Sequence, residues 1–170
     1  MKSTHCTSNR PFFVNMDTTK QTLALKATCL LSAVLGFATP ITSTSVSIFG
    51  TTITASSYLT KACVNGACTN YGGDAPDKQK AAIAFCAIAL IICFVQCVLH
   101  FTAKPPNHAL LGKLSLPASF SFLISFSLIA NQLADSPVAP AYSAGFAFII
   151  IGWLASLGHF FVSNKAAASA

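Results

Sequence analysis

Long runs without a charged residue constrain this chain more than any other feature of its sequence. Three windows contain no Asp, Glu, Lys or Arg, and one more contains only Lys26, near its start; they are residues 22–42, 81–101, 114–133 and 138–163. A helix rises about 1.5 Å per residue, so each window can cross a hydrocarbon core about 30 Å thick. We expect the long side chain of Lys26 to reach the nearer interface. The windows predict four membrane-spanning helices.

The composition excludes an ordinary soluble domain. Only 8% of the 170 residues are charged and 54% are apolar, whereas about 25% of the residues in a soluble domain are charged. Ten basic residues against four acidic ones give a net charge of +6, but the basic residues are scattered and form no patch with interleaved aromatic residues. We therefore expect the lipid bilayer as the partner, and no nucleic acid.

The lengths of the links predict how the spans are arranged. Segment 43–80 is long, whereas 102–113 and 134–137 are short, and short links join antiparallel neighbours. We predict an all-α membrane protein, an antiparallel four-helix transmembrane bundle with a small β-rich extracellular or lumenal first loop at 43–80.

The basic residues predict the orientation of the chain. Seven of the ten lie in or beside the tail 1–21, the turn 102–113 and the tail 164–170, and basic residues favour the cytoplasmic side. Both termini are therefore expected in the cytoplasm, with the loops 43–80 and 134–137 outside. The N-terminal tail has no apolar run of signal-peptide length, so we interpret 22–42 as a retained anchor. We expect the plasma membrane, with an internal organelle membrane as the alternative.

Small residues at helical spacing predict close packing of the spans. The first span offers Ala24, Thr28, Ser32 and Gly36, and the other spans offer similar rows of Ala, Gly, Ser and Cys. Such rows let helix backbones approach closely in lipid, although they also suit contacts between copies of the protein. Gln96 is predicted to form an interhelical hydrogen bond, with a polar pathway as the alternative.

The first loop carries the most specific local signals. Its first part, 43–61, is rich in Thr, Ser, Ile and Val and predicts strands, and Asn65-Gly66 predicts a two-residue hairpin turn. Cys63 then stands opposite Cys68, with Cα atoms about 4.5–5.5 Å apart, so we predict a disulfide. A metal-binding pair is the alternative, but the loop contains no His and no other Cys to complete a tetrahedral site.

The remaining reactive residue types suggest little chemistry. His100, His108 and His159 are predicted to lie at the cytoplasmic ends of the spans as interfacial residues, with a metal or haem site as the alternative. Cys97 is a candidate for palmitoylation or a small apolar residue of the core. No nucleophile with a base, phosphate-binding loop or carboxylate pair is present. We therefore expect no enzyme, no cofactor and no metal.

The layout of the chain resembles the claudin-like superfamily of four-span proteins. Three stretches resemble the amastins, surface proteins of trypanosomatid parasites; they are Thr39-Pro40-Ile41, residues 78–85 (KQKAAIAF), and residues 144–147 (AGFA) with Trp153. Tyr58, Lys61 and Cys63 stand where the amastin loop signature has an aromatic residue, a basic residue and its second Cys, while its first Cys and Trp-Gly have no counterpart here. The resemblance implies a non-catalytic surface protein with a sheet-bearing outer domain.

These observations predict a non-enzymatic membrane protein whose outer loop has a contact or membrane-organising role. The residues expected to make the contacts are Tyr58, Lys61, Asn65 and Gly66, beside the disulfide. The expected partners are other membrane proteins or further copies of the chain. An accessory subunit of an organellar membrane complex, or a small transporter or channel subunit, are the alternatives.

Overall fold

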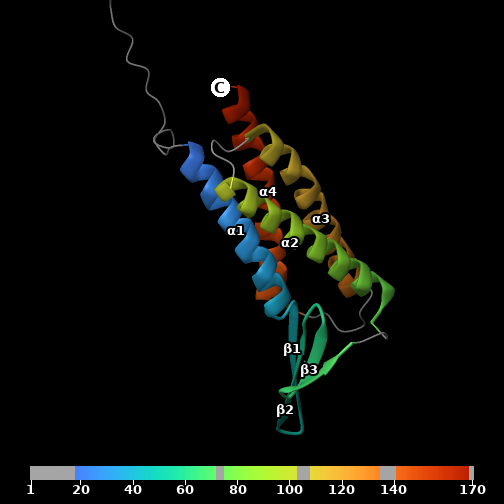
Figure 1. The fold of residues 1–170 in the computed structure, drawn as a ribbon. Helices are drawn as coiled ribbons and strands as arrows, with labels where there is room; N and C mark the ends of the chain where they lie inside the picture. The colour runs from blue at the N-terminus through green and yellow to red at the C-terminus, as the bar shows by residue number, and fades with distance from the viewer. Residues whose placement is uncertain (1–17, 72–74, 103–107, 135–140, 169–170) are drawn as a thin grey trace, which may run out of the picture.

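The computed structural model describes residues 18–71, 75–102, 108–134 and 141–168, and it is mostly helical (Figure 1). Its four long helices are α1 (Thr18–Ala38), α2 (Asp77–Thr102), α3 (His108–Ala134) and α4 (Ala144–Ala168). All four are long and apolar enough to cross a membrane. The prediction of four such helices is therefore confirmed. The start of α1 and the end of α4 lie at the end of the molecule farthest from the sheet.

The helices do not begin and end where the charge-free windows do. Pro40 cannot continue a helix, so α1 ends at Ala38 and the chain enters a strand within the predicted span. The other three helices begin at Asp77, His108 and Ala144, which is earlier than predicted for α2 and α3 and later for α4. The membrane boundaries along these helices stay a prediction, and the expected links at 103–107 and 135–137 lie outside the described residues, as does most of the N-terminal tail.

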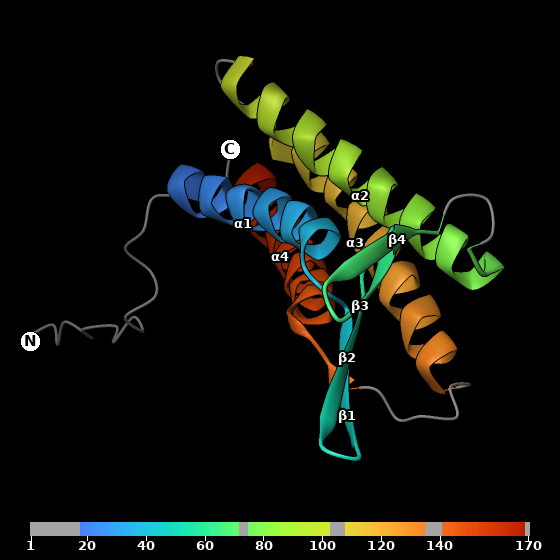
Figure 2. The ribbon, with the colours of Figure 1, turned by 90° about the horizontal axis from the view of Figure 1, so that it is seen from below.

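A small antiparallel sheet stands at one end of the helices, as the β-rich loop predicted. Its strands are β1 (Thr42–Ile48), β2 (Thr51–Ser57), β3 (Lys61–Val64), β4 (Ala67–Asn70) and β5 (Ala141–Tyr142), in the order β4-β3-β2-β1-β5. The short strand β5 precedes α4 and pairs with the first two residues of β1. In both views the β1–β2 hairpin extends away from the helices (Figures 1 and 2).

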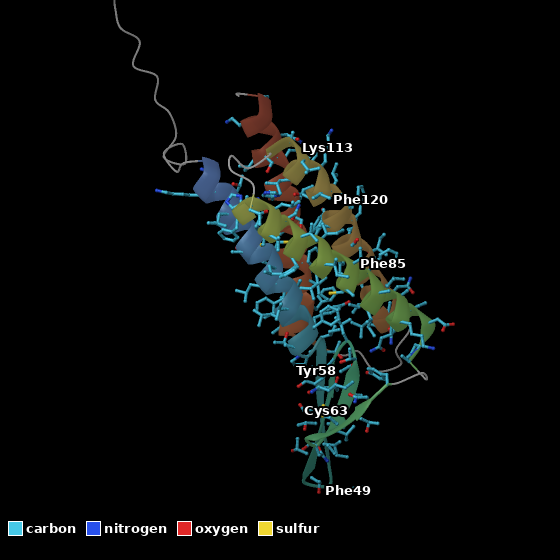
Figure 3. The ribbon with its side chains drawn as sticks, viewed as in Figure 1. Phe49, Tyr58, Cys63, Phe85, Lys113 and Phe120 are labelled. Carbon is cyan, nitrogen blue, oxygen red and sulfur yellow. A yellow bond between two sulfur atoms is a disulfide. The ribbon has the colours of Figure 1, made fainter. Side chains whose placement is uncertain are left out.

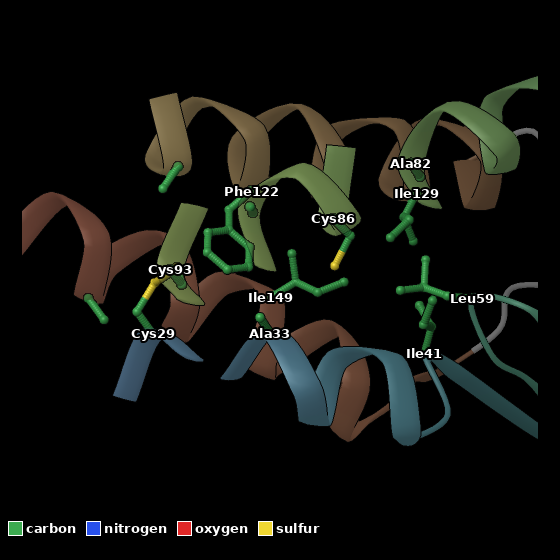
Figure 4. Packing of buried hydrophobic residues seen from close by; sticks show 13 residues of the cluster. Cys29, Ala33, Ile41, Leu59, Ala82, Cys86, Cys93, Phe122, Ile129 and Ile149 are labelled. Atoms are coloured by element: carbon green, nitrogen blue, oxygen red, sulfur yellow. A yellow bond between two sulfur atoms is a disulfide. The ribbon is translucent and has the colours of Figure 1, made fainter. Parts of the chain in front are cut away.

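The helices enclose one core. α4 packs against α1 and α3, and α2 packs against α3. The centre of the core holds Phe122 of α3, Ile149 of α4 and Ala33 of α1, all fully buried (Figure 4). A Cβ placed on Gly152 would lie 2.8 Å from the Phe122 ring, and one on Gly36 would lie 3.1 Å from Ile149. Glycine at these two positions is what allows the large side chains to fill the core.

The small residues predicted to form a ridge on α1 are only partly in the interface. Ser32 and Gly36 are buried, but Ala24 and Thr28 are exposed. Four residues advance a helix by about 400°, so a strict four-residue row winds away from its partner. The buried stripe mixes three- and four-residue steps, and its members are Thr22, Lys26, Cys29, Ala33 and Gly36.

The base of the sheet is joined to the helices by backbone hydrogen bonds and by side chains. Gln79, on the first turn of α2, is buried and donates hydrogen bonds to the carbonyl oxygens of Tyr58 and Leu59 at 3.2 and 2.9 Å. The side chain of Leu59 is fully buried in the core cluster. The amide of Gly145 donates to the carbonyl oxygen of Pro40 at 2.9 Å, which joins the start of α4 to the link between α1 and β1.

Candidate functional site

The β3–β4 hairpin has the register that Asn65-Gly66 predicted. Val64 pairs with Ala67, and Cys63 pairs with Cys68. The two cysteines lie at disulfide distance with Cα atoms 4.0 Å apart, slightly closer than expected. Cys63 is buried and Cys68 is exposed. The pair joins β3 to β4 beside their turn, and Cys63 lies between Tyr58 and Phe49 along the sheet (Figure 3).

The residues expected to make outer contacts already interact with one another or with the neighbouring strand. The side-chain oxygen of Asn65 accepts a hydrogen bond from the amide of Thr54 at 2.9 Å, which ties the turn to β2. Asn65 and Gly66 both have positive φ angles, 49° and 84°, as a type I′ turn requires. The Lys61 ammonium lies 4.8 Å from the centre of the Tyr58 ring, a cation–π contact at the base of the sheet.

The β1–β2 hairpin presents two chemically different faces. Directly paired residues of an antiparallel ladder share a face. The pairs Ser43–Ser56, Ser45–Thr54 and Ser47–Thr52 form a face of hydroxyl groups. The opposite face is mixed: it carries the exposed apolar side chains of Val46, Ile53 and Val64, together with Thr44 and Thr51. No charged residue occurs between 42 and 60, so the projecting hairpin is electrically neutral.

An aromatic residue ends this hairpin, which the sequence did not predict. Phe49 is fully exposed, and its φ of 50° puts it in the left-handed region, where bulky residues are rarely found. The next residue, Gly50, has a φ of 80°. The available signal was Phe49-Gly50 between two Thr- and Ser-rich runs, but Phe is not a usual turn residue. Phe49 marks the point of the sheet farthest from the helices (Figure 3).

Polar side chains of three helices meet inside the bundle, at the end away from the sheet. Gln96 of α2 donates to the hydroxyl of Ser115 on α3 at 2.8 Å and to the carbonyl oxygen of Leu111 at 3.0 Å, so its predicted interhelical hydrogen bond is confirmed. His159 of α4 contacts the same hydroxyl through Nδ1, and its Nε2 lies 3.2 Å from the Ser163 hydroxyl. Because the Ser115 hydroxyl donates to the Leu111 carbonyl, its lone pairs accept from Gln96 and His159.

Two of the predicted interfacial side chains are instead buried. Lys26 is only 1% exposed, and its ammonium lies 3.0 Å from Nδ1 of His100. Its position on α1 faces α2, so the side chain is enclosed by helices. His159 is also 1% exposed. The depth of both residues in a membrane, and therefore their interfacial placement, stays a prediction. The side chain of His108 lies outside the described residues.

The cysteines of the bundle occupy different environments. Cys29 and Cys93, both buried, lie at disulfide distance across the α1–α2 contact with Cα atoms 6.4 Å apart (Figure 4). The sequence did not predict this pairing, because spacing along one helix does not reveal a partner on another. Cys86 is buried and Cys97 is half-buried, and both are free thiols. Cys97 therefore remains a candidate for acylation.

No protein-family model matches the sequence, and no curated protein matches it. Among the described residues, no group of three or more His, Cys, Asp or Glu side chains could hold a metal ion. The candidate site has two distinctive parts, the neutral projecting β1–β2 hairpin and a set of hydrogen-bonded polar side chains buried in the bundle.

Proposed function

We propose that this chain is a non-enzymatic integral membrane protein that uses its sheet to contact another molecule at the membrane surface. The four helices cross the bilayer with successive helices in opposite directions, and both termini lie in the cytoplasm. The sheet then lies outside the cell or in a lumen. The amastin-like and claudin-like layout is part of this proposal and implies the same placement.

The observation that carries the proposal is the exposed Phe49 at the tip of the hairpin. A large apolar side chain in a left-handed backbone conformation costs stability. It also costs solubility, because it is fully exposed at the tip. Strained residues of this kind cluster at functional sites. The exposed side chains of Val46 and Ile53 continue an apolar surface from Phe49 toward the base of the hairpin.

Positive charge supports the orientation. The described end away from the sheet carries Lys20, Lys26, Lys113 and Lys165, and the sheet end carries Lys61, Lys78 and Lys80. The N-terminal tail and the 102–113 link add Lys2, Arg10 and Lys104. These residues add positive charge to the end away from the sheet, and the more basic end of a membrane protein favours the cytoplasm. The plasma membrane is the proposed location, with an organelle membrane as its alternative.

The orientation is tested by labelling Cys63 and Cys68 on intact cells with a membrane-impermeant maleimide, before and after an impermeant reductant. We expect labelling only after reduction, and none in the variant that combines Cys63→Ser with Cys68→Ser. Labelling that requires permeabilised cells would overturn the plasma-membrane placement. Labelling without reduction would contradict the disulfide.

The contact itself is tested with a photoreactive amino acid in place of Phe49, and in a matched variant in place of Thr60. Both positions are exposed, but Thr60 lies at the base of the sheet between β2 and β3. We expect a discrete crosslinked product from position 49 in intact cells and little from position 60. Equal crosslinking from both positions, or none from position 49, would contradict a contact at the tip.

One observation favours a second candidate function, a small transporter or channel subunit. Lys26 and His159 are buried within the helices, and ionisable residues inside a membrane commonly mark ion pathways. Reconstitution in vesicles with an ion or proton gradient tests this function. Flux that is lost in Lys26→Met would favour transport over a purely contact-making role.

A further inference from the structure

An open groove runs along the outer surface of α3 where it meets the start of α2. Its volume is about 510 Å³, and its walls are mostly apolar. The lining residues are Lys78, Leu123, Ile124, Ser127, Leu128 and Asn131. Five of the six come from α3, at positions that share one side of a helix. The groove therefore follows the helix axis and does not cut across the bundle.

The polar and apolar parts of the groove are separated along the helix. Lys78 lies in the first turn of α2, and its ammonium donates a hydrogen bond to the side-chain oxygen of Asn131, near the end of α3. Leu123 lies eight residues before Asn131, which is about 12 Å along a helix. The groove thus has a cation and an amide at the sheet end and apolar side chains one to two turns deeper.

We propose that this groove binds one anionic phospholipid of the surrounding bilayer, with the phosphate at Lys78 and an acyl chain along α3. The inference rests on the proposed passage of α2 and α3 through the membrane. Lys78 and Asn131 then stand at the depth of the headgroups, while Leu123, Ile124 and Leu128 stand in the hydrocarbon region. An ammonium at that depth attracts a headgroup phosphate, most strongly where the headgroup carries a net negative charge.

Two other features favour a lipid over a protein as the occupant. The groove is lined by a helix face that would be surrounded by lipid in the bilayer. Along the groove, a cation and an amide are followed by apolar side chains, and this order matches the headgroup and acyl chain of a phospholipid. The groove on the sheet provides a contrast, because it is lined by hydroxyl and methyl groups and carries no charge; its lining includes Ser43, Ser45, Thr54 and Ser56. Nothing there would select a headgroup.

The chain contains a matched control for the cation. Lys80 lies two residues after Lys78 on the same turn of α2, but it does not line the groove. Its ammonium lies 3.8 Å from the Asp77 carboxylate. Removing either charge changes the net charge of the protein equally. A general electrostatic effect would therefore appear in both variants, whereas a lipid site at the groove would be lost only without Lys78.

The test is native mass spectrometry of the full-length protein, purified in detergent and mixed with phosphatidylglycerol or phosphatidylcholine at equal concentration. We expect one retained phosphatidylglycerol, at about five times the occupancy of phosphatidylcholine. Lys78→Gln should reduce the preference to near unity, while Lys80→Gln and the charge-conserving Lys78→Arg keep it. Leu128→Trp, which fills the groove, should reduce retention of both lipids.

Equal retention of the two lipids by the wild-type protein, or an unchanged preference in Lys78→Gln, would overturn the proposal. Loss of the preference in Lys80→Gln as well would show a general charge effect and would also overturn it. Alkaline carbonate extraction of the membranes from which the protein is purified tests the proposed membrane placement separately. A protein that stays in the membrane but binds no selected lipid contradicts only the groove.

Discussion

The bundle and the sheet use polar residues in opposite ways. Inside the bundle, the hydroxyl of Ser115 is fully used by groups from three helices, and glycines allow side chains and backbones to come within contact distance. In the β1–β2 hairpin, the paired Ser and Thr hydroxyls of one face and the apolar side chains of the other are open to the surroundings. Contacts within the chain therefore constrain the residues of the bundle, whereas the side chains of the hairpin make few such contacts and are available to other molecules.

This difference predicts how the two regions respond to substitution. A change in the bundle alters contacts within the chain, so it should be measured as a loss of stability. A change on the hairpin removes few internal contacts, so it should leave stability nearly constant and alter binding. Each of the following variants is paired with a control that separates these outcomes.

The largest expected effect is that of Gly145→Ala, at the start of α4. A Cβ there would lie 2.7 and 2.8 Å from the carbonyl oxygens of Thr39 and Pro40, and backbone atoms cannot move away as a side chain can. We expect a loss of about 3 kcal/mol in the free energy of unfolding, measured by denaturation in detergent. Gly158→Ala is the control, because its Cβ would be at an ordinary 3.6 Å from Leu25. If both variants were equally stable, the close contact at Gly145 would be contradicted.

Ser115→Ala is expected to have the next largest effect. It removes the hydroxyl that accepts from Gln96 and His159, so buried donors lose a partner at a cost of about 2 kcal/mol. Ser127→Ala is the control, because that exposed hydroxyl only donates to the Leu123 carbonyl on its own helix. We expect its unfolding free energy to stay within about 0.5 kcal/mol of the wild type. A similar loss in both variants would show that the hydroxyl network contributes nothing beyond helix propensity.

Removal of the Cys63–Cys68 bridge should affect the sheet and leave the bundle intact. The variant that combines Cys63→Ser with Cys68→Ser frees a short loop, whose closure is worth about 2 kcal/mol in the chain-entropy model. We expect faster hydrogen exchange in β3 and β4 with an unchanged thermal midpoint for the helices. Thr69→Ala, on the exposed surface of β4, is the control. A matching loss of protection in α2 would mean that the two regions unfold together.

Much of the fold could be predicted because each signal was local. Charge-free windows gave the number of long helices, and Asn65-Gly66 gave the register that brings Cys63 opposite Cys68. Both signals lie within one segment of the chain and depend on its own residues. The ends of the helices were less predictable, because the strand at Thr42 and the short strand before α4 depend on pairing with each other.

The residues that the sequence did not reveal depend on neighbours from other segments. Lys26 was expected at the interface because a single helix gives it a route to water, but α2 places His100 beside it. Cys29 and Cys93 meet only because two helices cross at that point. Phe49 was missed for another reason, since its backbone conformation opposes the usual preference of its residue type. The contact surface that we propose therefore begins at a residue whose backbone conformation the local sequence does not predict.

Phe49→Asn is expected to have the smallest effect on stability, with the opposite sign to the others. Asn adopts a positive φ far more readily than Phe, and Asn-Gly is the preferred sequence for this type of turn. The variant should therefore be more stable by up to about 1 kcal/mol, while the contact made by the tip weakens.

Phe49→Ala separates the two effects, since it removes the ring without relieving the backbone. Hydrogen exchange of β1 and β2, together with crosslinking from an adjacent photoreactive residue at position 51, measures both quantities. If Phe49→Asn stabilised the hairpin and kept full crosslinking, the aromatic side chain would have no role in the contact. The hairpin and the bundle would then differ in packing but not in a contact function of the tip.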